Sequence, residues 1–207
     1  MDQLLNQKSF RMKKKPSTFL NMLITLFVIT VIAGLSLGFI NELTLEPKAK
    51  AKLAKKTKAL QLVLPEFNNN PVREVLKIKS DLAKDSVEIY TAKFDQKIKG
   101  TAVVGSTEKG FSGLIKIMVG FKPDGGINNI VVLEQKETPG LGTKMKEEAF
   151  INQYRDKNPG TSNLKTSKDG GEIDALTGAT ITTRAFSDAV EMAYQVYSDN
   201  INAEKDE

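Results

Sequence analysis

The 207-residue sequence contains no cysteine, no histidine and no tryptophan. Without cysteine the chain can form no disulfide, no thiolate nucleophile and no cysteine-ligated zinc or iron–sulfur cluster. Without histidine it also lacks the commonest general base and the commonest transition-metal ligand. Any chemistry must therefore come from carboxylates, hydroxyls, lysines, backbone groups or a bound cofactor. The absence of thiols is compatible with either side of a membrane.

The formal net charge of +5 is unevenly distributed along the chain. Residues 1–40 contain five basic residues against one acidic residue, and residues 48–58 contain six lysines and no acid. From residue 59 onward, 19 basic residues are outnumbered by 22 acidic ones. A nucleic-acid-binding protein would carry its basic residues on the folded domain, so this distribution argues against nucleic acid as a partner.

Residues 19–40 form an apolar run of 22 residues without a charge. As a helix this run would be about 33 Å long, which is enough to cross a hydrocarbon core of roughly 30 Å. The apolar region of a secretory signal peptide is shorter, about 7–15 residues, and ends at a small-residue cleavage site. We therefore expect an uncleaved transmembrane helix over 19–40, preceded by a basic cytoplasmic segment over 1–18, and we keep a signal peptide as the alternative.

Charge alone leaves the orientation of this span nearly balanced. Lys13, Lys14 and Lys15 precede it, whereas Glu42 and Glu46 follow it, which favours a cytoplasmic N-terminus. The six lysines of 48–58 lie close enough to the span to oppose that preference.

A second helix is expected over 41–65, entered at Pro47 and ended near Pro65. Its apolar residues recur at helical spacing and lysines fill the other face. We interpret it as a solvated connector in preference to a helix lying on anionic lipid headgroups. The apolar positions are Leu45, Ala49, Leu53, Leu60 and Leu64.

Residues 66–207 are expected to form an α+β domain, an antiparallel sheet with flanking helices. Short Val- and Ile-rich runs separated by glycine-containing turns predict strands over 87–94, 100–104, 114–121 and 127–133. Apolar residues at helical spacing predict helices over 143–157 and 180–201.

Two glycine-containing segments could carry chemistry. The segment ETPGLG, at 137–142, lies between a predicted strand and a predicted helix, and DALTGATIT, at 174–182, leads directly into the last helix. The small residues Gly178 and Ala179 would let a ligand approach the main chain, and the start of a helix suits a phosphate. Helix capping by Thr180 or Thr182 needs no ligand and explains the same pattern.

The string DALTGATIT resembles the flavinylation motif of a family of FMN-binding proteins, and ETPGLG is a second hallmark of that family. Together with the segment GFSGLIKIMVGF at 110–121, the chain length and the single anchor, these motifs resemble the G subunits of Rnf-type ion-translocating ferredoxin:NAD oxidoreductases. The C subunits of sodium-translocating NADH:quinone reductases are the alternative within the same family. A histidine is common shortly before ETPGLG in this family, whereas Gln135 and Lys136 stand here.

The resemblance implies that FMN is esterified through its phosphate to the hydroxyl of Thr180. A separate magnesium-dependent flavin transferase, with FAD as the donor, would form this bond, and Asp174 would serve its recognition. Gly178 and Ala179 would permit close approach of the cofactor. Thr177 and Thr182 would donate hydrogen bonds to the phosphate or cap the helix. The ring would be walled by Glu137, Thr138, Gly140 and Leu141, with Phe111 either stacked on it or part of the core.

The resemblance also implies partners and a location. The partners would be other membrane and iron–sulfur subunits of the complex, the flavin transferase during maturation, and the lipid bilayer. The FMN domain would lie on the extracytoplasmic side of a bacterial cytoplasmic membrane. The chain would carry electrons without being a complete enzyme, because it has neither a dinucleotide-binding glycine motif nor iron–sulfur ligands. A tethered sensor or structural domain without flavin is the alternative of another class.

Overall fold

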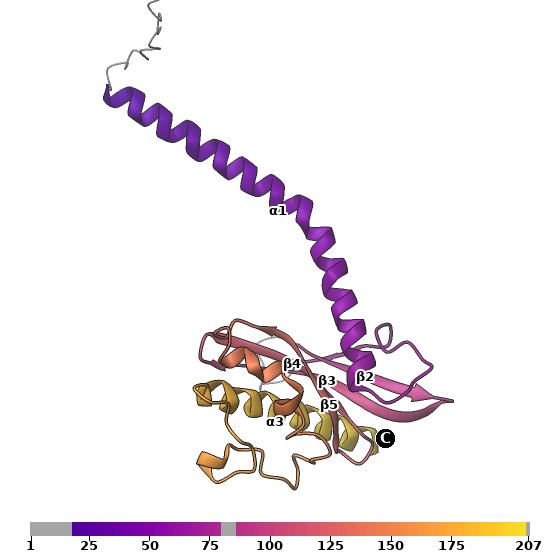
Figure 1. Cartoon of the computed structure of the whole chain (residues 1–207). Helices are drawn as coiled ribbons and strands as arrows, with labels where there is room; N and C mark the ends of the chain where they lie inside the picture. Colours follow the sequence, from indigo (N-terminus) through magenta and orange to yellow (C-terminus); the bar gives the residue numbers. More distant parts are fainter. Residues whose placement is uncertain (1–17, 80–85, 206–207) are drawn as a thin grey trace, which may run out of the picture. The chain divides into compact units, whose positions relative to one another are not determined.

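The computed structural model describes residues 18–79 and 86–205, with side chains up to residue 201 (Figure 1). The basic segment expected over 1–18 lies outside the described residues except for Thr18. The chain divides into two units, Met1–Lys50 and Ala51–Glu207, which are described separately below.

Most of the first unit belongs to helix α1, Phe19–Val63, which begins at the expected apolar run. An 18-residue window in this helix has a mean hydropathy of 2.6, and none of its residues is buried. By length and composition α1 could cross a membrane, and it alone could do so among the helices of the described residues.

The helix expected to start at Pro47 is instead continuous with the apolar run, because α1 passes through Pro47. Proline has no backbone N–H, so the carbonyl of Leu43 loses its intrahelical donor there. The other hydrogen bonds of a 45-residue helix outweigh this local loss. The expected end near Pro65 is confirmed, since α1 ends at Val63.

The second unit contains a five-stranded antiparallel sheet in the order β1-β2-β3-β4-β5. This confirms the expected α+β class, and the turn between β2 and β3 has positive φ at Asp95 and Gln96, as a tight hairpin requires. β3 is longer than expected, and the three-residue β1 was not anticipated. The strands are β1 Leu76–Ile78, β2 Val87–Phe94, β3 Lys97–Gly110, β4 Gly113–Phe121 and β5 Ile127–Gln135.

Helix α3, Thr180–Lys205, packs against one face of the sheet and confirms the helix expected from residue 180. Its buried Phe186, Val190 and Ala193 join the strands in the larger core cluster. Gly105 of β3 permits this close approach, because a Cβ there would lie 2.2 Å from the carbonyl oxygen of Ala189.

The last turns of α1 cover the opposite face of the sheet. Leu60 and Val63 are buried with Tyr90 and Met118 in a second cluster. Gly120 of β4 lies against the end of this helix, because a Cβ there would be 1.9 Å from the Val63 oxygen.

The helix expected over 143–157 does not form as one element. A short 3₁₀ helix, η1 Gly142–Lys146, is followed by a single turn, α2 Glu148–Ile151. Glu147 between them has an extended ψ of 140°, and this break lets both Met145 and Phe150 enter the core. These two residues would lie about 140° apart around a regular helix. A second 3₁₀ turn, η2 Ser167–Asp169, precedes the glycine-containing segment that leads to α3.

Candidate functional site

A cavity of about 580 Å³ lies at the start of α3. Three segments far apart in the sequence form its walls: the turn between β3 and β4, the segment after β5, and the residues that lead into α3. The lining residues are Phe111, Glu137, Thr138, Leu141, Gly142, Gly178, Ala179, Thr180, Ile181 and Thr182.

Eight of the predicted site residues therefore come together, and the other three lie outside the lining. Gly140 has a positive φ of 76° and shapes the turn of the 137–142 loop without lining the cavity. Thr177 and Asp174 are exposed, and neither lines the cavity. Asp174 is held through its backbone, since its amide donates to Gln153 Oε1 at 2.7 Å.

Two lining residues were not singled out from the sequence. Gly142 belongs to ETPGLG, so its motif was a sufficient signal, and it is buried at the start of η1. Ile181 occupies a variable position of the second motif, and only the fold reveals that its half-exposed side chain borders the cavity.

The start of α3 leaves backbone donors beside the cavity. Gly178 has a φ of 73°, and the amide of Ala179 donates to Leu176 O at 2.9 Å, which together turn the chain into the helix. The amide of Thr183 donates to Ala179 O at 3.0 Å. The amides of residues 180–182 have no intrahelical acceptor, as is general for the first turn of a helix.

The three threonines at this helix start have different surroundings. Thr183, which the motif analysis did not single out, accepts from the Leu176 amide at 3.1 Å and donates to Ala179 O at 3.1 Å. The Thr182 hydroxyl donates to Glu137 Oε2 at 2.6 Å. The hydroxyl of Thr180 has no hydrogen-bond partner among the described residues, and its half-buried side chain lines the cavity. Within that part of the chain, neither Thr180 nor Thr182 caps the helix through its side chain.

Glu137 is buried, with 4% of its surface exposed. Besides the Thr182 hydroxyl, its carboxylate accepts the backbone amide of Ser112 at 2.9 Å. Thr182 therefore donates its one proton to Glu137, which differs from the expectation that it would donate to a phosphate. Glu137 borders the cavity as expected, but its carboxylate is engaged by protein donors.

Apolar side chains form the rim of the cavity. Phe111 is 66% exposed, Ile181 50% and Leu141 43%, and these are among the few large exposed apolar side chains of the second unit. Phe111 is thus not a core residue, which removes one of its two alternatives. The Leu141 side chain lies close to Gly178, where a Cβ would be 3.3 Å from Leu141 Cδ2.

An ion pair fixes the η2 turn, before the motif, to α3. Arg184 donates from Nε and Nη2 to the two carboxylate oxygens of Asp169, each at 2.7 Å. The Arg184 guanidinium and the Thr166 hydroxyl hold the pKa of the Asp169 carboxyl well below its usual range. Within the described residues, no cluster of acidic side chains could hold a metal ion.

Comparison with known proteins shows which family the chain belongs to. Residues 110–195 match the FMN-binding domain family. The G subunit of the Na(+)-translocating ferredoxin:NAD(+) oxidoreductase complex of Acetobacterium woodii is 32% identical over 183 residues, 83% of this chain and 88% of that protein. The G subunit of the ion-translocating oxidoreductase complex of Erwinia tasmaniensis is 34% identical over 178 residues, 81% of this chain and 84% of that protein.

Among solved structures, the C subunit of the Na(+)-translocating NADH-quinone reductase from Parabacteroides distasonis matches with 18% identity and a TM-score of 0.49. The match covers 73% of this chain and 92% of that one. The sequence relatives, which align over most of both chains, decide the assignment: the chain belongs to the family of G subunits of Rnf-type ion-translocating oxidoreductase complexes and contains its FMN-binding domain.

Proposed function

We propose that this chain is a membrane-anchored electron carrier whose FMN is joined by a phosphoester to the hydroxyl of Thr180. The observation that carries the proposal is the setting of that hydroxyl. It lines the cavity and has no partner among the described residues, and it stands at the first residue of a long helix.

The residues around Thr180 fit the cofactor. The cavity of about 580 Å³ is of the size that cofactor sites have, roughly 300–1,000 Å³. Small residues at 178 and 179 leave the backbone accessible, and the free amides of the first turn of α3 suit a phosphate. Phe111, Leu141 and Ile181 offer apolar surface to a flat ring.

Among the described lining residues Glu137 is the single ionisable one. Its carboxylate accepts hydrogen bonds from the Ser112 amide and the Thr182 hydroxyl. The protein thus binds the phosphate through backbone dipoles and leaves the ring to contacts with apolar side chains. The bound FMN would supply the capacity to accept and pass on electrons.

Attachment requires a second protein. No histidine or cysteine exists in the chain to activate the Thr180 hydroxyl. A flavin transferase that uses FAD would form the bond between Thr180 Oγ and the FMN phosphorus. The pyrophosphate bond of FAD breaks, AMP leaves, and the hydroxyl proton is released. The exposed Asp174, three residues before Thr177, is available for recognition by that enzyme.

We further propose that the carrier works inside a ferredoxin:NAD oxidoreductase ion pump, with membrane and iron–sulfur subunits as its partners. The family assignment supports this role, because the Acetobacterium woodii relative bears that name. Residues 19–40 would anchor the chain in the bacterial cytoplasmic membrane, residues 41–65 would connect the anchor to the FMN domain of residues 66–207, and that domain would lie outside the cytoplasm.

The attachment is tested by intact-protein and peptide mass spectrometry after coexpression with a flavin transferase. The wild-type chain should gain the mass of one FMN on the peptide that contains Thr180. Thr180→Ala should gain none, whereas Thr180→Ser should keep at least part of the modification. Thr161→Ala, which removes an exposed hydroxyl elsewhere, is the matched control and should be modified like the wild type.

FMN attached to Thr180→Ala at any residue would refute the assignment of the site. A wild-type chain without flavin would refute the carrier and favour the tethered sensor. The orientation is tested separately by a reporter fused after Glu207 that is active only when exported. Activity of a cytoplasmic reporter at that position would reverse the proposed topology.

A further inference from the structure

The carboxylate of Glu137 joins all three walls of the cavity. It belongs to the 137–142 loop, accepts the Ser112 amide of the β3–β4 turn at 2.9 Å, and accepts the Thr182 hydroxyl of α3 at 2.6 Å. Both partners of the shorter bond are buried, since Glu137 is 4% and Thr182 1% exposed. A short bond to a charged acceptor in a buried place is among the stronger hydrogen bonds of a protein.

Two glycines leave the room that this carboxylate occupies. A Cβ at Gly110 would lie 2.7 Å from Glu137 Oε1. A Cβ at Gly142 would lie 2.9 Å from both Glu137 Oε2 and Thr182 Oγ1. A side chain at residue 110 or 142 would therefore clash with the Glu137 carboxylate.

Stability alone is a weak reason for this arrangement. A buried charged group carries a large desolvation cost, and a well-packed apolar substitute is often equally stable. The first turn of a helix, by contrast, lacks half of its backbone hydrogen bonds and is held by tertiary contacts. The Glu137–Thr182 bond is such a contact, placed two residues beyond Thr180.

We propose that Glu137 is a positioning residue for modification of Thr180. By holding Thr182 and Ser112 at once, it fixes the first turn of α3 against the other two walls. The Thr180 hydroxyl therefore points into a formed cavity before flavin arrives. This inference rests on the proposed function of Thr180 and adds to it the residue that presents that hydroxyl.

The test compares Glu137→Gln, Thr182→Val, the double variant and Thr182→Ser. Glutamine keeps the shape of residue 137 but replaces one accepting oxygen by a donor, and valine keeps the shape of threonine without its hydroxyl. Glu134→Gln, an exposed acid near the end of β5, is the control for loss of one negative charge. Each full-length chain is prepared both with and without flavin transferase.

The first measurement is the rate of FMN attachment by intact mass. We expect Glu137→Gln and Thr182→Val each to slow attachment by about ten-fold or more, as for a lost hydrogen bond to a charged group. The double variant should be no slower than the slower single one, because both substitutions break the same bond. Thr182→Ser and Glu134→Gln should attach FMN at close to the wild-type rate.

The second measurement is hydrogen exchange of the unmodified chains over residues 183–186, the first amides of α3 with intrahelical acceptors, and it requires no cofactor. Exchange there should be about ten-fold faster in Glu137→Gln and Thr182→Val, and unchanged in the two controls. Wild-type attachment rates in Glu137→Gln and Thr182→Val would overturn the proposal, as would unchanged exchange. If the wild-type chain takes up no flavin, the proposed function fails, while the exchange experiment still decides whether Glu137 holds the first turn of α3.

Discussion

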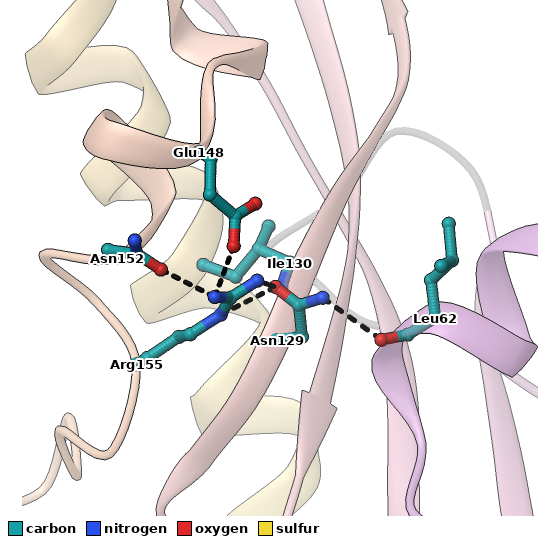
Figure 2. Close-up of polar contacts among 6 residues, drawn as sticks. All are labelled: Leu62, Asn129, Ile130, Glu148, Asn152 and Arg155. Atoms are coloured by element: carbon teal, nitrogen blue, oxygen red, sulfur yellow. Dashed lines mark hydrogen bonds and ion pairs between the residues drawn. The ribbon is translucent and has the colours of Figure 1, made fainter.

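The side-chain amide of Asn129 donates to the carbonyl oxygen of Leu62 at 3.0 Å, across 67 residues of sequence (Figure 2). Its side-chain oxygen accepts from the guanidinium of Arg155, at 3.1 Å from Nε and 3.0 Å from Nη2. The neighbouring Asn128 donates to Val63 O at 2.9 Å in the same way. The last carbonyls of a helix lack intrahelical donors, so these two asparagines on β5 supply the end of α1 with hydrogen bonds.

The Asn129 link gives the first prediction. Asn129→Ala should lower the free energy of unfolding by about 1–3 kcal/mol, because Leu62 O loses a donor and Arg155 loses an acceptor. Asn129→Asp keeps an acceptor for Arg155 and loses only the donor, so its loss should be smaller. Urea unfolding of the chain in detergent, followed by tyrosine fluorescence in the absence of tryptophan, measures both. Equal stability of Asn129→Ala and the wild type would show that this link contributes nothing.

The second prediction concerns the contact between β4 and the end of α1. Gly120→Ala would place a Cβ 1.9 Å from Val63 O, and backbone atoms there cannot give way cheaply. The loss in unfolding free energy should reach at least the roughly 1–3 kcal/mol that is common for overpacking. Gly126→Ala is the control, since its Cβ would meet only the Asp124 side chain, at 3.1 Å, and no backbone atom. Similar losses in the two variants would contradict the close packing at Gly120.

The third prediction separates backbone strain from the shape of the cavity. Gly178 and Gly170 both have positive φ, at 73° and 81°, so alanine at either site should cost about 1–2 kcal/mol of stability. Only the Cβ at Gly178 would also meet a neighbour, Leu141 Cδ2 at 3.3 Å. Gly178→Ala should therefore reduce FMN attachment, while Gly170→Ala should not. Unfolding free energies and intact masses measured together decide the point, and equal attachment in both would place Gly178 outside the site.

The fourth prediction is a pH dependence at Glu88. Burial raises the pKa of this carboxyl, but hydrogen bonds from Lys56 and Tyr90 and the charges of Lys56 and Lys77 lower it by more, so the pKa lies below its ordinary 4.5. A carboxyl with a depressed folded pKa stabilises the fold fully above its unfolded pKa and loses that contribution as the pH falls through the folded value. Stability should therefore fall below pH 4.5 more in the wild type than in Glu88→Gln. Parallel stability profiles of the two proteins from neutral pH to about one unit below that value would refute the prediction.

The strands were predictable because short Val- and Ile-rich runs are bounded by turn residues. The expected 87–94 strand coincides with β2, and the helix expected from residue 180 is α3. The helix expected over 143–157 is interrupted at Glu147. This break allows both Met145 and Phe150 to pack in the core, which one regular helix would not. Local patterns carry no information about such long-range packing.

Most residues that line the cavity were named from two motifs. Small residues and threonines at a helix start fit a ligand and helix capping alike, so the resemblance to the family's motifs made the choice. The partners of individual hydroxyls were not. Thr180 and Thr182 are chemically identical in the sequence, yet one lines the cavity without a partner among the described residues and the other is buried on Glu137. Only the approach of the 137–142 loop to α3 distinguishes them.

The sequence by itself determined the apolar span, the sheet-forming runs and the two motifs that mark this family, because each depends on residues within a short stretch of chain. The tertiary structure decided which residues line one cavity, which of Thr180 and Thr182 has a hydroxyl without a partner among the described residues, and which asparagines cap the end of α1. Those properties depend on contacts between residues 25 to 67 positions apart, such as Ser112 with Glu137, Glu137 with Thr182 and Leu62 with Asn129. Contacts of this kind exist only after the sheet has brought its distant segments together.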